Sequence, residues 1–420
     1  MTETTKLDGT ALAAQAAVEP DGGNTEPLTP YTLGEVVGTF RKWLHMPDPS
    51  PLYVNLAAVV ANRMPGDPVW LLTVSVPGGG KTELLQSMTR LPNVYQAATL
   101  TEGALLSGTS KREKAADAKG GLLREIGDFG ILLVKDFGSI LALNKDTRGP
   151  ILQGLREVYD GEWTRHVGTD GGRSLHWRGK VGLIGGATPA IDSHHGVMSI
   201  LGERFVFYRL PELDENEHAR GALKHIGQED EMRGDLARAV QSLFLALTIP
   251  TTQPTMSDQE RDWLILLSRM TARCRAPVLR EAFTHEIEQI PGAEAPTRLV
   301  LVMAKLLTGL KVIGLPTGDA YDIIRHVALD SMPQLRRKIL AYLWKAETWA
   351  TTTEIATEVS TPTVTTRRAI EDLTCYAVID RQPGGQGKAD AWQLSDLGRE
   401  LYDGAQTFSQ IRGDMHTVSV

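Results

Sequence analysis

Three glycines followed by a lysine and a threonine occupy positions Gly78, Gly79, Gly80, Lys81 and Thr82. Glycine adopts backbone angles that are closed to other residues, so such a run can form a tight loop. A loop of this kind turns consecutive N–H groups toward one point, where an anion binds well at the N-terminus of the next helix. Lys81 adds a mobile positive charge. The segment therefore predicts an anion-binding loop.

The residues on either side of this loop favour phosphate as the anion. Five apolar or β-branched residues between positions 71 and 76 predict a strand, and a helical pattern follows the threonine. This context fits the phosphate loop G-x-x-x-x-G-K-[ST], although Ser75 stands where the first glycine is expected. The hydroxyl of Thr82 can reach Mg²⁺. The residues predicted to bind the nucleotide are Pro77, Gly78, Gly79, Gly80, Lys81, Thr82 and Glu83.

A second candidate follows an apolar strand predicted at 131–134, where the chain reads Lys135-Asp136. Phosphate-loop enzymes end this strand with an acid that holds Mg²⁺, and many add a second acid that polarises the attacking water. Asp136 is the only acid at this tip, and Lys135 stands where the first acid is expected. We expect the two side chains to face opposite ways, with Asp136 as a metal ligand and catalytic acid in one of these two roles. Asp128 and Glu125 are the next candidates.

The composition limits the classes of function. The chain has 420 residues, enough for two or three domains, with 42% hydrophobic and 23% charged residues, as in a soluble globular protein. A net charge of −7 argues against an extended nucleic-acid coat but allows local basic loops. The two cysteines, Cys274 and Cys375, exclude a disulfide framework and fit a reduced, cytoplasmic setting. The most apolar helical stretch contains Lys305 and Lys311, so we expect no membrane span.

Hydrophobic periodicity divides the chain into three patterned regions between two tails. Short helical patterns over 31–64, followed by alternating strand and helix patterns from Val69 to about Pro211, predict an α/β core with a parallel sheet over 31–213. Apolar-faced helices without convincing strands predict a helical lid over 214–330. Residues 331–405 form a third pattern, analysed below, and 406–420 form a tail. Residues 1–30 are rich in Thr, Ala, Glu, Gly and Pro and are expected to be disordered.

The core continues after the Lys135-Asp136 tip with a helix, a hairpin and a further strand. The sequence TDGG supplies the turn of the hairpin. The strand KVGLIGGATP ends at the polar residue Thr188. The following segment, MSILGERFVFYRLPEL, carries Arg204 and Arg209.

The order of these segments resembles that of AAA+ ATPases of the pre-sensor-1 hairpin clade, in particular minichromosome maintenance helicases and bacterial enhancer-binding activators. VSVPGGGKTELL resembles the Walker A motif, GILLVKDF the Walker B motif, and LREVYDGEW the helix that leads into the pre-sensor hairpin. IGGATP resembles the sensor-1 strand, GERFVFYRLPELDENEHARGALKHI the arginine-finger segment, and APTRLVLVMAKLL the helix that begins with the sensor-2 arginine. The resemblance spans about residues 52–313.

This resemblance implies ATP and Mg²⁺ as cofactors and a homo-hexameric ring as the assembly. In such a ring, Arg204 or Arg209 of a neighbouring subunit would stabilise the charge on the transferred phosphate. The catalytic residues that the resemblance implies are Asp136, Thr188, Arg204 and Arg298.

Two basic segments are candidates for contact with DNA, because phosphate contacts need only positive charge and reach. The first is the loop at 107–121, in a region that lines the central pore of related ATPases; its alternative is a solvated loop. The second is the hairpin. The residues concerned are Lys111, Arg112, Lys114, Arg165, His166 and Arg173.

The C-terminal pattern resembles a winged helix-turn-helix domain. Helices are expected at LRRKILAYLWKA, TTTEIATEVS and TPTVTTRRAIEDLTCYAVI, followed by two strands around a glycine turn. Thr365, Arg367 and Arg368 lie on the presumed recognition helix, whose first turns enter the major groove in this motif. The alternative is a winged helix that binds a protein.

Together these patterns predict ATP-driven DNA translocation or unwinding by a replication protein of a bacterium, phage or mobile element, with DNA as its partner. One rival is a transcription activator, but the G-A-F-T-G-A loop of such activators is absent from 107–121. A second rival is a nucleotide-switched DNA-binding scaffold or helicase loader, which Lys135 keeps open because the acid pair is incomplete.

Overall fold

The computed structural model comprises two compact units, between which the chain passes more than once. Unit 1 contains Met1–Ile191, Tyr208–Pro254 and Lys305–Pro316, and unit 2 contains Asp192–Phe207, Thr255–Ala304 and Thr317–Val420. The structure describes residues 4–6, 27–97, 100–107, 120–168, 172–198, 202, 204–212, 214–253, 255–281, 283–386 and 388–406.

A five-stranded sheet forms the centre of unit 1 within the described residues, in the order β3-β4-β7-β2-β8. The pairs β3–β4, β4–β7 and β2–β7 are parallel. Almost every residue of β2, β4 and β7 is buried, as expected for parallel strands covered on both faces. The predicted α/β core with a parallel sheet is confirmed. The strands are β2 (Trp70–Val74), β3 (Val94–Ala97), β4 (Phe129–Val134), β7 (Lys180–Ala187) and β8 (Phe205–Arg209).

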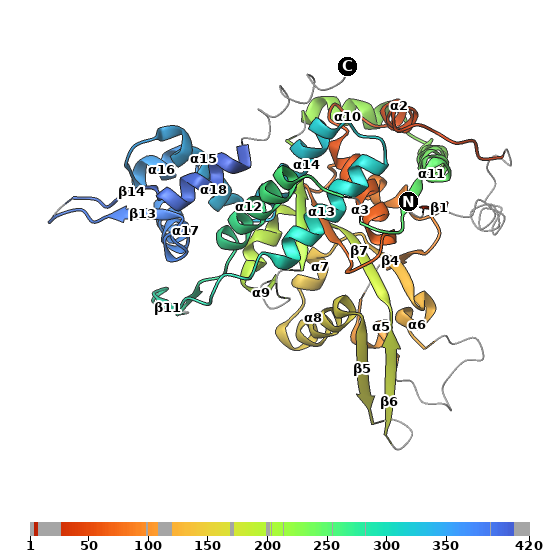
Figure 1. Cartoon of the computed structure of the whole chain (residues 1–420), viewed down its shortest axis with the longest axis horizontal. Coiled ribbons are helices and arrows are strands. Elements are labelled where there is room, and N and C mark those ends of the chain that lie inside the picture. Colours follow the sequence, from red (N-terminus) through yellow and green to blue (C-terminus); the bar gives the residue numbers. More distant parts are fainter. Residues whose placement is uncertain are drawn as a thin grey trace. The chain divides into compact units, whose positions relative to one another are not determined.

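Helices pack around this sheet (Figure 1). Helix α3 has eleven buried residues out of fourteen and contacts both β2 and β7, which explains why residues 56–61 are all apolar. The helices of unit 1 are α2 (Leu33–Trp43), α3 (Ser50–Arg63), α4 (Lys81–Gln86), α5 (Glu102–Leu105), α6 (Leu122–Ile126), α7 (Gly138–Leu141), α8 (Lys145–Asp160), α10 (Glu215–Lys224) and α11 (Glu229–Ala246). Among the described residues, no helix has both the length and the apolarity to cross a membrane.

Hydrogen bonds across the carboxyl edge of the sheet hold the loops that follow the strands. The N–H of Ser75 donates to Ala187 O at 3.1 Å, and the N–H of Phe137 donates to Gly186 O at 2.7 Å. The loops after β2 and β4 are therefore each tied to the end of β7. Because parallel strands end at one edge, the polar residues after them are brought together there.

A hairpin projects from the sheet beside α8 (Figure 1). Strand β5 (Glu162–Val167) pairs with β6 (Arg173–Arg178) in an antiparallel register that places Trp163 opposite Trp177. Both tryptophans are buried and fix the base of the hairpin. The predicted hairpin is present, and residues 169–171 of its turn lie outside the described residues.

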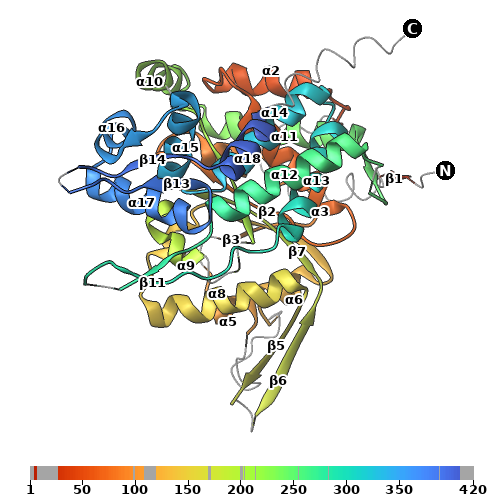
Figure 2. The same ribbon diagram turned by 60° about the vertical axis from the view of Figure 1, so that its left-hand side comes forward.

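Unit 2 combines helices with small antiparallel sheets. Strands β13 and β14 pair with each other, and β12 pairs with β14 (Figure 2). The helices and strands expected over 334–394 are present. The elements of unit 2 are α9 (His195–Met198), α12 (Asp258–Cys274), β10 (Leu279–Arg280), β11 (Ile287–Gln289), α14 (Thr317–Asp330), α15 (Gln334–Ala346), β12 (Ala350–Thr351), α16 (Thr352–Glu358), α17 (Thr363–Cys375), β13 (Ile379–Gln382), β14 (Ala391–Leu394) and α18 (Asp396–Gln406).

The division between the units falls within three elements: strand β8, helix α13 (Thr297–Val312) and the 3₁₀ helix η2 (Pro189–His194).

The expectation of no strands over 214–330 is wrong. Strand β9 (Thr248–Pro250) pairs with β1 (Thr4–Lys6), and β10 pairs with β11. Each of these strands has only two or three residues, which is too short for alternation of apolar and polar residues to be recognised in the sequence.

Asn62 joins α3 to the first strand of the sheet. This buried side chain accepts a hydrogen bond from Val69 N at 2.8 Å and donates to Val69 O at 2.9 Å, so it imitates a neighbouring strand just before β2. Asn62 therefore satisfies both backbone groups of Val69, which is itself buried.

We predict that Asn62→Ala lowers the free energy of unfolding by about 1–3 kcal/mol, because the buried Val69 N–H loses its acceptor and Val69 O keeps only the donor Leu183 N, at 3.4 Å. Urea unfolding followed by circular dichroism measures the change. Asn216→Ala, at an exposed position of α10, is the matched control and should change stability far less. Equal effects of the two substitutions would contradict the role given to Asn62.

Candidate functional site

The glycine loop lies between β2 and α4 at the carboxyl edge of the sheet. Gly78 and Gly80 have φ values of 79° and 81°, which lie in the left-handed region that strains other residues. A side chain at Gly79 would place its Cβ 2.9 Å from the Ser75 hydroxyl oxygen. The structure thus explains why three glycines occur here, and Ser75 fits beside them.

Lys81 folds back over the loop. Its ammonium donates hydrogen bonds to the carbonyl oxygens of Ser75 and Val76, both at 3.3 Å. Burial lowers the pKa of Lys81, and the negative charge of Asp136 partly opposes this shift. A buried cation that bonds only to neutral carbonyl groups gains free energy when an anion arrives, so Lys81 is suited to binding phosphate.

Asp136 is exposed and lies close enough to Lys81 to act on its pKa. One oxygen of its carboxylate accepts a hydrogen bond from Gly138 N at 3.0 Å, at the start of α7. Strand β4 ends at Val134, so the expectation that Lys135 and Asp136 alternate across a strand does not apply. A bend, rather than strand alternation, sets the direction of the two side chains.

The remaining polar positions of this edge are Thr82, which is exposed in the first turn of α4, and Thr188, which is half-buried directly after β7. Within the part of the chain that the structure describes, no group of three or more His, Cys, Asp or Glu could hold a metal ion. Thr82 and Asp136, the two residues that the sequence predicts to hold Mg²⁺, both follow strands that end at this edge. Such a short protein ligand set is typical of Mg²⁺ that also binds water and substrate phosphates.

Two residues of later helices contact the loop and were not identified from the sequence. His218 of α10 lies 2.9 Å from the carbonyl oxygen of Gly78, measured from Nε2. Because a carbonyl only accepts, Nε2 carries the proton. Arg233 of α11 forms an ion pair with Glu83 at 3.2 Å. Helical periodicity predicted both helices but gives no signal for which polar residue reaches another element.

We predict that His218→Ala accelerates amide hydrogen exchange in the glycine loop, because the Gly78 carbonyl loses its donor. His218→Gln should restore part of the protection, since an amide N–H can replace the imidazole N–H. His176→Ala, in the β5–β6 hairpin, is the control. Unchanged exchange at residues 78–82 in His218→Ala would exclude this restraint.

The two arginines of unit 2 assigned to catalysis lie near Gly202. Arg298 donates to Gly202 O at 2.6 Å, and Arg204 is only 5% exposed. An arginine that acts on a neighbouring subunit needs an accessible guanidinium, so this burial does not favour Arg204 as the arginine finger. Arg209, the alternative on the same segment, is half-buried at the end of β8.

The basic residues expected to contact DNA differ in how their charges are engaged. Arg165 pairs with Glu102 at 2.8 Å and donates to Leu106 O at 2.6 Å, so its charge is largely balanced within unit 1. His166 is exposed and bonds the Ser174 hydroxyl at 2.8 Å, and Arg173 is half-buried. Lys111, Arg112 and Lys114 lie outside the described residues.

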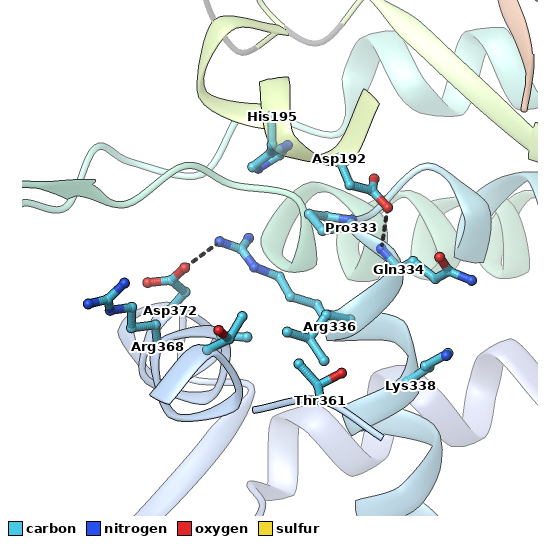
Figure 3. Close-up of a pocket in the computed structure, with 12 residues that line it drawn as sticks. Asp192, His195, Pro333, Gln334, Arg336, Lys338, Thr361, Arg368 and Asp372 are labelled. Atoms are coloured by element: carbon cyan, nitrogen blue, oxygen red, sulfur yellow. Dashed lines mark hydrogen bonds and ion pairs between the residues drawn. The ribbon is translucent and has the colours of Figure 1, made fainter. Parts of the chain in front are cut away.

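The two candidate arginines of helix α17 differ in their ion pairs. Arg367 pairs with Glu371 at 3.0 Å and lies 3.6 Å from Asp390. Among the described residues, Arg368 makes no ion pair; it lines a cavity of about 450 Å³ (Figure 3). Thr365 lines the same cavity. Arg368 is therefore the stronger candidate for an external anion.

The same cavity contains groups that serve the structure of unit 2. Arg336 donates to the carbonyls of Cys274 and Ala276 and pairs with Asp372 at 2.9 Å (Figure 3). Burial and the charges of Arg336 and Arg275 lower the pKa of His195 to about 3. The imidazole is thus neutral near pH 7 and adds no charge to the cavity.

Comparisons with known proteins add little to this description. No family model matches the chain, and no curated protein matches it. Among solved structures, a chain described as an apo structure of the NrS-1 C-terminal region is similar at a TM-score of 0.30 and 11% sequence identity. That alignment covers 59% of this chain and 58% of the other. A similarity this low does not define a family.

Proposed function

We propose that the protein is an ATPase with an AAA+ core and a helical lid. The observation that carries this proposal is the position of the glycine loop and Lys81 next to Asp136 at the carboxyl edge of a parallel sheet. The loop supplies backbone N–H donors, Lys81 a cation, and Asp136 a carboxylate. These groups fit a nucleotide with its Mg²⁺.

Each residue of this edge has a distinct task in the proposal. Lys81 leaves the carbonyls of Ser75 and Val76 and binds phosphate oxygens. Thr82 and Asp136 hold Mg²⁺, which neutralises charge on the phosphates of bound ATP. Thr188 lies after β7, where its hydroxyl can orient a water molecule or a phosphate oxygen. The accelerating arginine comes from a neighbouring subunit of a ring, with Arg209 better exposed than Arg204.

We further propose that unit 2 ends in a winged helix that binds DNA, so that the protein is an ATP-driven DNA motor. Helices α15, α16 and α17 precede the paired strands β13 and β14, the element order of a winged helix-turn-helix. Arg368 on α17 adds a cation at the rim of a cavity. Translocation or unwinding is the work that combines ATP hydrolysis with DNA binding.

A nucleotide-switched scaffold or loader is the second candidate, because Asp136 has Lys135 rather than an acid beside it. ATP turnover measured with and without single-stranded DNA separates the two functions. Stimulated turnover supports the motor, and ATP binding without turnover supports the switch.

We predict that Lys81→Ala abolishes ATP binding while the circular dichroism spectrum stays unchanged. Unaltered ATP affinity by calorimetry would contradict the nucleotide site.

We predict that Asp136→Asn lowers Mg²⁺-dependent ATP turnover at least about tenfold, equivalent to ~1.4 kcal/mol of barrier. Asparagine keeps an acceptor for Gly138 N, so the loop should remain folded and the loss reports the missing charge. Lys135→Asp, which restores a pair of acids, should keep or raise the rate. Normal turnover by Asp136→Asn would show that another acid serves, with Asp128 and Glu125 to be tested next.

We predict that Arg368→Ala weakens binding of duplex DNA more than Arg367→Ala, because Glu371 and Asp390 already balance Arg367. Fluorescence anisotropy at several salt concentrations should also show a slope against log salt reduced by about one for Arg368→Ala. Arg261→Ala, on α12, is the control. Equal affinities of all variants would favour a winged helix that binds protein.

A further inference from the structure

The hairpin β10–β11 carries apolar side chains into solvent. Phe283 at its tip is 90% exposed, and Leu279, Ile287 and Ile290 are 44%, 39% and 49% exposed. Figures 1 and 2 both show β11 at the end of an extended segment that leaves the helices of unit 2. Several exposed apolar side chains on one projecting hairpin mark a segment that a partner can cover.

The base of this hairpin is fixed by Arg280. Its guanidinium donates to Asp372 at 2.8 Å, to Glu371 and Arg368 O at 3.2 Å, and to His285 O at 2.9 Å. An isolated two-stranded hairpin is at best marginally stable in water. These bonds join the hairpin to α17, so the exposed tip is held in place rather than left to fray.

The tip is acidic as well as apolar. Glu286 and Glu288 flank Ile287, and both are exposed. A partner must therefore combine an apolar patch with positive charge.

The C-terminal half of helix α10 in unit 1 offers such a surface, because the acidic residues of this helix, Glu215 and Glu217, lie in its first turn. None of its described side chains is buried, and Leu223 and nearby Ile226 are 67% and 69% exposed. Arg220 and Lys224 are exposed on the same half of the helix. The pair that Arg220 forms with Glu217 at 3.0 Å is a surface contact of small energy, so it does not prevent an external carboxylate from binding.

We propose that the β10–β11 hairpin of one chain docks on the end of α10 of a second copy. Phe283 and Ile287 would cover Leu223 and Ile226, and the hairpin glutamates would face the basic residues of α10. Such a contact joins two different surfaces, so it propagates from copy to copy and closes into a ring when the rotation allows. This inference rests on the ring assembly of the proposed function but requires no bound nucleotide.

Charge reversal tests the contact on the full chain. Glu286→Lys with Glu288→Lys should raise the dissociation constant of the assembly at least about tenfold, and Arg220→Glu with Lys224→Glu should do the same. Combining all four substitutions should restore association. Asp262→Lys with Glu358→Lys, at exposed positions of α12 and α16, is the matched control and should leave it unchanged. Phe283→Ser should weaken association at every salt concentration. Molecular mass is measured by analytical ultracentrifugation over a range of protein and salt concentrations.

The proposal is overturned by a wild-type chain that stays monomeric, by pair reversals that act like the control, or by a fourfold variant that does not recover. Reversals that change unfolding stability but not mass would place the contact within one chain, which also overturns it. ATP affinity is measured in parallel by calorimetry. If the charge-reversal variants lose assembly but still bind ATP, the nucleotide site is unaffected. If assembly responds to the charge swap as expected but the chain does not bind ATP, only the proposed ATPase function is refuted.

Discussion

The candidate nucleotide site depends on the shared carboxyl edge of the parallel strands. Hydrogen bonds from Ser75 and Phe137 to the end of β7 hold the loops after β2 and β4 against the same strand. Lys81 and Asp136, which are far apart in the sequence, thereby lie at the same edge of the sheet. The charge of Asp136 acts on Lys81 only because of this arrangement.

The ammonium of Lys81 is buried at this edge and, among the residues described, has hydrogen bonds to carbonyl groups but no hydrogen bond to a carboxylate. Lys81 is 8% exposed and bonds to carbonyl oxygens, which carry only partial charge. Burial disfavours the charged form of Lys81 more than the negative charge of Asp136 favours it, so the pKa of Lys81 is lowered. A loop of this kind is prepared electrostatically for an anion. By contrast, Arg165, Arg336 and Arg367 have carboxylate partners, and their charges are already used inside the fold.

The sequence predicted those features that follow from local pattern. The apolar run before Ser75, the glycines with Lys81, and the helices around Arg336 and Arg367 were recognisable because periodicity and glycine placement act over a few residues. Contacts made between elements were not recognisable. Neither the burial of Arg204 nor the bond from His218 to Gly78 leaves a trace in spacing. The bend at Lys135 was missed because the strand pattern does not show that hydrogen bonding stops at Val134.

Asp372, which is half-buried on α17, pairs with two arginines rather than with one. Its two oxygens receive Arg336, which supports the start of α15, and Arg280, which supports the β10–β11 hairpin. The carboxylate of Asp372 thus joins α17 both to helix α15 and to the β10–β11 hairpin. A redesigned α17 that lacks Asp372 would therefore lose the ion pair to Arg336 and the shortest of the bonds that α17 makes to Arg280 of the hairpin. The surface presented by the hairpin and the surface presented by α17 cannot be redesigned as independent modules.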